Sequence, residues 1–215
     1  IEFASTDPAL GDDDLIAVGD GNNIVVGGVG NDTVTAGSGA DVVRVGMGPT
    51  PMLYYAEASA EDVDGGIQIT GSHNPANYNG FKLVFQGRPF FGADILELGR
   101  MAERGDWMSG EGEAERREVM GAYIERLLAG LAGIDPAGLA ALRIGWDAGN
   151  GAAGPALELL VKKLPGEHHC LYTEVDGNFP NHHPDPTEEK NLADLKALVA
   201  AKNLHFGVAF DGDGD

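Results

Sequence analysis

The stretch ALRIGWDAGNGAAGPALELLVKK, residues 141–163, decides the fold class of this chain. Its apolar segment Arg143–Asp147 has the length of a buried β-strand, and a glycine-rich turn separates it from a helical pattern over Gly151–Lys163. The alternation continues with a strand, a helix and a strand, which we expect at His169–Thr173, Leu192–Lys202 and His205–Phe210. Strands that alternate with helices of this length predict a mostly parallel sheet, and therefore an α/β architecture.

The region before this stretch mixes the same two periods. We expect a short helix, two strands and two further helices there, at Pro51–Ala60, Gly66–Thr70, Phe81–Phe85, Asp94–Glu103 and Glu113–Leu131. The pattern breaks at AGLAGIDPAGL, residues 129–139, which indicates a domain boundary. These features divide the chain into a first segment over residues 1–38 and two domains over residues 39–134 and 135–215.

The first segment has a nine-residue period. Residues 1–43 contain no Lys or Arg, and from Ala9 to Arg44 they divide into ALGDDDLIA, VGDGNNIVV, GGVGNDTVT and AGSGADVVR. Three places of the repeat are regular: an acid or amide at the sixth and an aliphatic residue at the eighth in all four repeats, and glycine at the fourth in the last three, as in Gly30, Asp32 and Val34. Glycine turns with one inward aliphatic residue per repeat are typical of a parallel β-roll.

The third repeat, GGVGND, resembles the calcium-binding nonapeptide of RTX proteins. Ca²⁺ takes oxygen ligands, and turn carbonyls with an aspartate from adjacent coils would supply them. Only this repeat matches fully, and Asn23 replaces an expected aspartate, so a Gly/Asp-rich surface stretch without metal fits the pattern as well. We place the seam with the following domain between Thr35 and Gly39.

Composition excludes several classes of protein. The chain has 215 residues, 34 of them acidic and 14 basic, and a net charge of −20. This balance argues against a protein that binds the phosphate backbone of nucleic acid. The single cysteine, Cys170, cannot form an internal disulfide, and no apolar run has the length of a membrane span. We therefore expect neither nucleic acid nor a membrane as a partner.

Two loops carry residues that suit chemistry. In Thr70–Pro75, TGSHNP, glycine permits a tight turn after a strand, and Ser72 is then either an exposed nucleophile or an ordinary helix cap. Lys82 follows ten residues later, where a hairpin-like return would bring it beside the serine.

The second loop is the terminal DGDGD, which follows an apolar strand at the edge where open α/β sheets bind ligands. Alternate residues of extended chain point the same way, so the carboxylates of Asp211, Asp213 and Asp215 should converge. Carboxylates that lie so close together repel one another unless a cation such as Mg²⁺ or Ca²⁺ neutralises them. A solvated acidic turn is the alternative.

A group of histidines could suggest a zinc site, but adjacent residues of extended chain point to opposite faces and the spacing matches no compact zinc signature. We interpret these residues as structural: His168, His169, Cys170, His182 and His183. We expect Asn150 and Gly151 to begin a helix rather than to contact a substrate.

Four stretches resemble the α-D-phosphohexomutase family, in particular bacterial phosphomannomutase/phosphoglucomutase. They are GPTPMLYYA, TGSHNPANYNGFK, EVDGNFPNHHPDPTEEKNL and AFDGDGD, in the order and spacing of that family from about residue 40 to residue 215. The resemblance implies two α/β domains with mixed or parallel sheets, preceded here by the short β-roll-like repeat segment. It also implies an isomerase that interconverts hexose 1-phosphates and 6-phosphates.

In that family Ser72 would be the phosphoserine that gives its phosphoryl group to a hexose phosphate, mannose or glucose phosphate, and takes another back from the bisphosphate intermediate. The resemblance implies that Ser72, Asp211, Asp213 and Asp215 hold Mg²⁺. It implies that Lys82 stabilises the phosphoryl oxygens or assists proton transfer, and that His73 acts as a proton relay. The magnesium ion would neutralise charge on the transferring group.

The chain also departs from its family. Family members have four domains, and this chain has room for the serine and metal domains only, so we expect a truncated mutase that does not complete turnover by itself. The repeat segment stands where the family's first strand and its basic residue would be. The alternative is a non-enzymatic calcium-binding protein whose function lies in the repeats. The mutase part would be cytoplasmic, whereas calcium-binding repeats of this type are extracellular.

Overall fold

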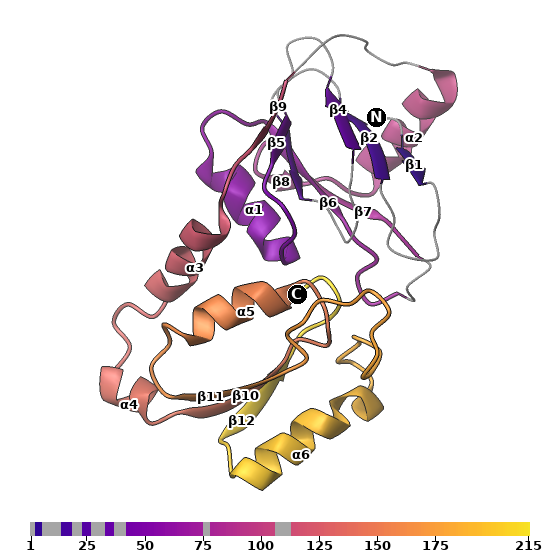
Figure 1. The fold of residues 1–215 in the computed structure, drawn as a ribbon. Helices are drawn as coiled ribbons and strands as arrows, with labels where there is room; N and C mark the ends of the chain where they lie inside the picture. Colours follow the sequence, from indigo (N-terminus) through magenta and orange to yellow (C-terminus); the bar gives the residue numbers. More distant parts are fainter. Residues whose placement is uncertain are drawn as a thin grey trace. The chain divides into compact units, whose positions relative to one another are not determined.

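The protein is described by a computed structural model that covers residues 3–5, 14–18, 23–26, 33–36, 42–74, 78–105 and 113–215. The chain forms two compact units (Figure 1). Unit 1 contains Ile1–Thr70 and Asn77–Val119, and unit 2 contains Gly71–Ala76 and Met120–Asp215. None of the described helices combines the length and the apolar character that crossing a membrane requires.

Unit 2 is built on a parallel sheet of three strands. β10 (Arg143–Asp147) lies in the middle, with β11 (Glu167–Leu171) on one side and β12 (Phe206–Ala209) on the other. Both pairings are parallel, and Ile144 is the partner of His168 and of Phe206. The parallel α/β arrangement expected for this half of the chain is therefore confirmed.

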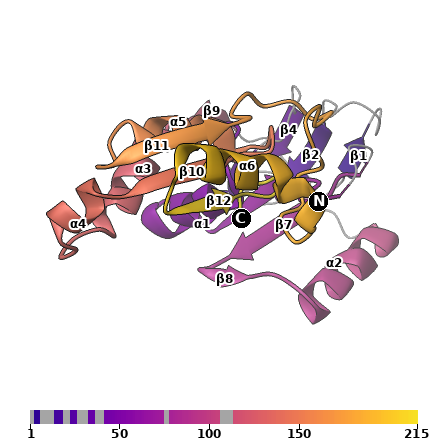
Figure 2. The same cartoon turned by 90° about the horizontal axis from the view of Figure 1, so that it is seen from below.

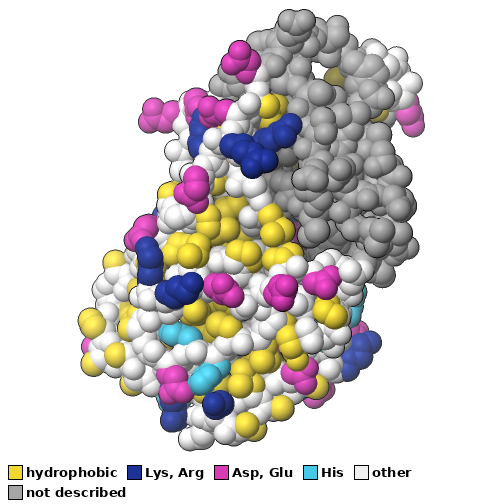
Figure 3. All heavy atoms as spheres, viewed as in Figure 1, with side chains coloured by type: hydrophobic (Ala, Val, Ile, Leu, Met, Phe, Trp, Pro, Cys, Tyr) yellow, Lys and Arg dark blue, Asp and Glu magenta, His cyan; other side chains and the backbone are white. Residues whose placement is uncertain are grey.

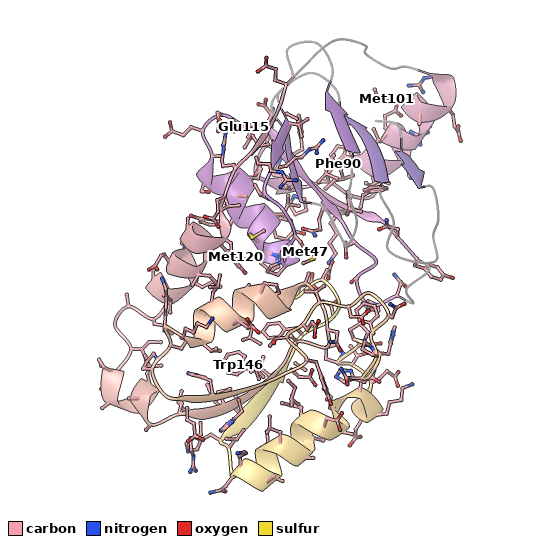
Figure 4. All side chains as sticks on the ribbon, in the orientation of Figure 1. Met47, Phe90, Met101, Glu115, Met120 and Trp146 are labelled. Atoms are coloured by element: carbon pink, nitrogen blue, oxygen red, sulfur yellow. The ribbon has the colours of Figure 1, made fainter. Side chains whose placement is uncertain are left out.

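Helices α5 (Ala153–Val161) and α6 (Ala193–Lys202) cover opposite faces of this sheet (Figures 1 and 2). Glycine at Gly207 lets α6 approach, because a Cβ there would lie 2.8 Å from Leu195 Cγ. On the other face Trp146 lies on the side of α5 (Figure 4). Its ring stacks on Phe210 at a centroid distance of 6.3 Å, which fixes the chain where β12 ends.

Three further elements complete unit 2: α3 (Met120–Ala129), α4 (Pro136–Ala140) and the 3₁₀ turn η1 (Glu189–Leu192). The helix expected over Glu113–Leu131 is wrong in its first part, because residues 114–116 form a strand and α3 begins at Met120. The break expected near residue 135 coincides with the start of α4. The first backbone N–H groups of this helix donate hydrogen bonds to the side chain of Asp135.

Unit 1 contains a mixed sheet in the order β8-β7-β6-β3-β5-β9. Its strands, in that order, are Arg88–Pro89, Phe81–Phe85, Gly65–Ile69, Asn23–Val26, Val42–Arg44 and Ala114–Arg116. The pairs among β6, β7 and β8 are antiparallel, and the others are parallel. Helix α1 (Thr50–Ser59) packs on β6, where a Cβ at Gly66 would lie 2.6 Å from Leu53 Cδ1.

Helix α2 (Ala93–Arg104) has no buried residue, whereas β9 is tied firmly to the sheet. Arg117, just after β9, donates its backbone N–H to Arg44 O and forms ion pairs with Asp62 and with Glu115 (labelled in Figure 4). These hydrogen bonds along β5 explain why residues 114–116 are a strand in spite of a helical pattern. On the face in Figure 3, acidic and basic side chains of the described residues are interspersed.

Strands of the repeat segment take part in two sheets. β1 (Phe3–Ser5), β2 (Asp14–Val18) and β4 (Thr33–Ala36) form a sheet in that order, and Leu15 of β2 pairs with Thr33 of β4. That parallel register separates the partners by two nonapeptide repeats. Strand β3, also from the repeats, lies instead in the mixed sheet between β5 and β6.

We expect Gly154→Ala to destabilise unit 2 although alanine favours a helix by about 1 kcal/mol over glycine. Gly154 lies in α5, and a Cβ there would be 1.9 Å from the carbonyl oxygen of Thr173. Relief of this clash would require movement of the backbone. Overpacking of this kind costs about 1–3 kcal/mol or more. Urea unfolding followed by circular dichroism measures the change.

Gly99→Ala is the matched control. Gly99 lies inside α2, and no atom lies within 4 Å of the position that a Cβ would take, so the same substitution should be neutral or slightly stabilising there. Equal unfolding midpoints for wild type and Gly154→Ala would contradict the close contact with Thr173.

Candidate functional site

The loop after β6 presents the hydroxyl of Ser72 to a carboxylate far along the chain. Ser72 Oγ donates a hydrogen bond to Asp211 Oδ2 at 3.0 Å and lies 3.3 Å from His73 Nδ1. Ser72 has a φ of 51°, in the left-handed region that residues other than glycine rarely adopt. Such backbone conformations cluster at functional sites, where surrounding contacts hold them.

The terminal loop brings three carboxylates together. Oxygen atoms of Asp211, Asp213 and Asp215 all lie within 4.8 Å of one another, and within the described part of the chain no other such group of three acidic, His or Cys side chains is found. Asp211 and Asp213 are buried, with 6% and 2% of their surface exposed, whereas Asp215 is exposed. This convergence matches the grouping expected from the sequence.

The reason for the convergence differs from the one expected. The loop is a turn rather than an extended strand, because Gly214 N–H donates to Asp211 O and Asp215 N–H donates to Asp211 Oδ1, each at 3.1 Å. Gly214 has a φ of 80°, which glycine adopts without strain. The turn, and not the alternation of a strand, gathers the carboxylates.

Burial and mutual repulsion make this cluster electrostatically costly. Removal from water, followed by the nearby charge of Asp213, raises the pKa of Asp211 to about 6. A divalent cation removes that cost, and hard carboxylate oxygens are the ligands that Mg²⁺ and Ca²⁺ prefer. The donor set therefore fits the metal that the resemblance implies.

Gly212 lets two loops touch, the metal loop (residues 211–215) and the serine loop (residues 71–74). A Cβ at Gly212 would lie 2.3 Å from the carbonyl oxygen of Ser72, so no other residue fits without movement. On its other side, Gly212 O accepts a hydrogen bond from Ala152 N–H at 2.9 Å, at the start of α5. The metal loop is thus held between the serine loop and the first turn of a helix.

Asn150 has a larger role than the helix start expected of it. The helix α5 begins at Ala153, and Asn150 lies in the preceding turn, 5% exposed and with a φ of 60°. Its side-chain amide donates to Glu174 O at 2.7 Å and its Oδ1 accepts from Asn181 Nδ2 at 2.8 Å. Asn150 therefore links two segments that the sequence does not show to be neighbours.

His182 and Asp147 form a second connection that sequence reasoning missed. His182 Nε2 lies 3.0 Å from Asp147 Oδ2, and its Nδ1 lies 2.9 Å from the carbonyl oxygen of His183. Asp147 is 1% exposed, and burial raises its pKa. Nearby, Tyr172 donates its hydroxyl to Asp194, which raises the pKa of Tyr172 to about 12. The feature of the sequence that could have indicated the His182–Asp147 pair was Asp147, an acid at the carboxyl end of an apolar strand.

The other histidines of that group have separate partners. His168 Nδ1 accepts a hydrogen bond from Trp146 Nε1 at 3.1 Å, and His169 Nε2 lies 2.6 Å from Glu167 Oε1. Of the predicted site residues, the structure brings Ser72, His73 and the three aspartates into unit 2. Lys82 belongs to unit 1, in β7, opposite Gln68 of β6.

Family models match most of this chain. The phosphoglucomutase/phosphomannomutase alpha/beta/alpha domain I matches residues 32–107, and domain II of the same family matches residues 121–215. A third model, the RTX calcium-binding nonapeptide repeat, matches residues 9–48 and so overlaps the beginning of domain I.

Bacterial relatives match the same region. Over 169 residues the chain is 44% identical to phosphomannomutase/phosphoglucomutase of Pseudomonas aeruginosa, which covers 79% of this chain and 35% of that protein. It is 41% identical over 171 residues to phosphoglucomutase of Neisseria gonorrhoeae, covering 79% of the chain and 36% of the relative. The chain thus spans about a third of the length of these curated relatives.

Solved structures agree with these matches. A phosphoglucomutase/phosphomannomutase family protein from Burkholderia thailandensis superposes with a TM-score of 0.78 at 38% identity, over 93% of this chain and 45% of that one. A putative phosphomannomutase from Thermus thermophilus, 23% identical, shares the fold with a TM-score of 0.72 over 91% of this chain and 47% of its own. Residues 32–215 carry domains I and II, and the chain therefore belongs to the phosphoglucomutase/phosphomannomutase family.

Proposed function

We propose that this chain carries the phosphoserine and metal domains of a hexose-phosphate mutase, with Ser72 as the residue that is phosphorylated. The observation that carries the proposal is the hydrogen bond of 3.0 Å between Ser72 Oγ and Asp211 Oδ2. It sets the nucleophile against a buried acidic cluster, where its phosphoryl group would meet a bound cation. The substrates we propose are mannose and glucose phosphates, the classes that the names of the relatives state.

The proposed reaction consists of two phosphoryl transfers, and the second returns to Ser72 a phosphoryl group in place of the one that it gives away in the first. Phosphorylated Ser72 gives its phosphoryl group to a free hydroxyl of the hexose phosphate, which loses a proton, and a hexose bisphosphate and free Ser72 result. After the bisphosphate turns over, Ser72 Oγ attacks its other phosphate and loses its own proton, while the sugar hydroxyl regains one. We assign to His73, whose Nδ1 lies 3.3 Å from Ser72 Oγ, the role of taking and returning that proton.

The metal loop supplies the electrostatic part of this scheme. We assign Asp211, Asp213 and Asp215 as ligands of Mg²⁺, with Ser72 or its phosphate as a further ligand. When bound, the cation neutralises charge on the transferring phosphoryl group, where most of the catalysis of this reaction lies. Lys82 is the proposed source of a second positive charge for the phosphoryl oxygens. Hexose phosphates are cytoplasmic metabolites, so we place this activity there.

We expect Ser72→Ala to abolish phosphorylation of the protein. The wild-type chain, incubated with Mg²⁺ and labelled glucose 1,6-bisphosphate, should gain one phosphoryl group, because Ser72 is the proposed acceptor. Intact-mass spectrometry and peptide mapping measure the gain and its position.

Ser59→Ala is the matched control, since Ser59 is an exposed serine of α1 and should leave the labelling unchanged. Labelling of the Ser72→Ala protein at the wild-type level would refute the assignment. Conversion of glucose 1-phosphate to glucose 6-phosphate by this chain alone would refute the expectation that it does not complete turnover.

The metal assignment predicts a definite pH dependence. Because the pKa of Asp211 is raised to about 6, this carboxyl favours folding of the metal-free protein most below its unfolded value of 3.8, and its contribution is lost as the pH rises through about 6. Cation binding has the opposite trend, because a proton on Asp211 competes with it. Below pH 6 we expect the Mn²⁺ affinity to fall by up to about tenfold per pH unit, as one competing proton requires.

Titration calorimetry with Mn²⁺ between pH 5 and 8 measures this trend. Asp213→Asn should weaken binding by at least about tenfold, because a ligand charge is lost inside a buried cluster. Asp135→Asn, an exposed helix cap that asparagine also fills, should bind as wild type does. Binding that is independent of pH, or unchanged by Asp213→Asn, would contradict the assignment.

A second function is favoured by the nonapeptide match over residues 9–48 and by the two-repeat register between Leu15 and Thr33. We propose that these repeats form a short β-roll that binds Ca²⁺ through turn carbonyls and Asp32, a residue outside the described part of the chain. Strand β3 pairs with β5 and β6, so calcium bound by the repeats would also stabilise unit 1.

Calorimetry separates the two metal sites. We expect a calcium heat that survives Asp211→Asn and is lost with Asp32→Asn, together with a calcium-dependent rise in the thermal midpoint that the wild type and Asp211→Asn show and Asp32→Asn does not. An intact chain that gives no heat with Ca²⁺ would remove this second function.

A further inference from the structure

A proline packs against the metal loop, and the proposed reaction assigns it no role. Pro184 has a wholly buried side chain. Its Cγ lies 3.4 Å from the position that a Cβ on Gly212 would take. Its Cβ lies 3.3 Å from the position that a Cβ on Gly149 would take. The ring therefore packs between the middle of the metal loop and the turn that follows β10.

His182 holds the segment that carries this proline. One ring nitrogen faces Asp147 Oδ2 at 3.0 Å and the other faces the carbonyl oxygen of His183 at 2.9 Å. Both contacts are hydrogen bonds when both ring nitrogens carry protons. Asp147 is itself fixed, because its Oδ1 accepts from Gly149 N–H at 2.9 Å and its backbone carbonyl accepts from Phe210 N–H at 3.0 Å.

The remaining neighbours confine the ring further. Tyr172 packs edge-on against His182 at a centroid distance of 5.5 Å, and the hydroxyl of Tyr172 is engaged by Asp194. The side chain of His182 is only 14% exposed, and that of Asp147 is not exposed at all. Apolar residues of similar volume are often as stable as a buried pair of this kind, so the pair is weak evidence for a role in stability.

We propose that His182 is a positioning residue for the metal loop. It joins the end of β10 to the segment 181–185, sets Pro184 against Gly212, and so fixes the spacing between Asp211 and Asp213. Phe210 N–H on the carbonyl of Asp147 ties the loop to the same anchor from the strand side. The inference rests on the proposed metal site, and it assigns to His182 and Pro184 a role in metal affinity that they exert without touching the metal.

The test uses the whole chain with two variants, His182→Gln and Pro184→Ala. Glutamine can donate to one of the two acceptors but cannot span both, and Pro184→Ala removes the contact with Gly212 while leaving the histidine in place. We expect each variant to weaken Mn²⁺ binding by about tenfold, the effect typical of groups that orient metal ligands. In the metal-free protein, the amides of Gly214 and Asp215 should exchange with deuterium several-fold faster.

His205→Gln is the matched control. His205 is also a structural histidine of unit 2, and its Nδ1 accepts from Arg143 N–H at 2.9 Å, at the amino-terminal end of β10. Any loss of stability in unit 2 should appear in this variant too, measured by urea unfolding, without a change in Mn²⁺ affinity or in exchange of the metal-loop amides.

The outcomes separate the inference from the proposed function. If the wild type binds Mn²⁺ and both variants bind it equally well, the positioning role is wrong. If His205→Gln weakens binding as much as His182→Gln, the effect is general destabilisation and the role is again wrong. If the wild type binds no Mn²⁺, the metal assignment fails, and hydrogen exchange of the loop amides still decides whether His182 and Pro184 hold the loop.

Discussion

The site depends on the close approach of two backbones at Gly212. The carbonyl oxygen of Ser72 lies where a side chain at Gly212 would begin, and the carbonyl of Gly212 is bound by the first turn of α5. Glycine is the residue that allows such an approach. Because this contact joins the serine loop to the metal loop, the hydroxyl of Ser72 reaches the carboxylate of Asp211. The chemistry proposed for the chain therefore depends on the absence of a side chain at Gly212.

The metal loop itself creates an electrostatic problem. The aspartates that its turn gathers are partly removed from water and repel one another, which raises the pKa of Asp211. A protein built only for stability would avoid this arrangement. Its cost would be offset by a bound cation, which is why we propose a metal at this cluster. Around the loop, Asn150 forms hydrogen bonds with Glu174 and Asn181, and His182 faces Asp147; we propose that the His182–Asp147 pair helps to hold the loop.

The first residues of the chain join two kinds of sequence in one sheet. β3 comes from a nonapeptide, yet it pairs in parallel with β5 and with β6, which leads to the serine loop. Such pairing uses backbone groups and needs only an extended segment of suitable length, so a strand from a repeat can take a place in a mutase sheet. The family models overlap over residues 32–48, which contain β4 and β5.

Local pattern determined much of this protein. The strand Arg143–Asp147, the helices that follow it, Ser72 after a strand and the grouping of acids after β12 could all be read from periodicity, turn residues and motif spacing, whereas the turn that groups those acids could not. Tertiary structure decided the rest: β9 where a helix was expected, Asn150 as a link, and His182 facing Asp147. Local periodicity reports how a segment folds with its chain neighbours. It carries no information on a hydrogen bond between residues dozens of positions apart, because only packing of the whole unit brings those groups together.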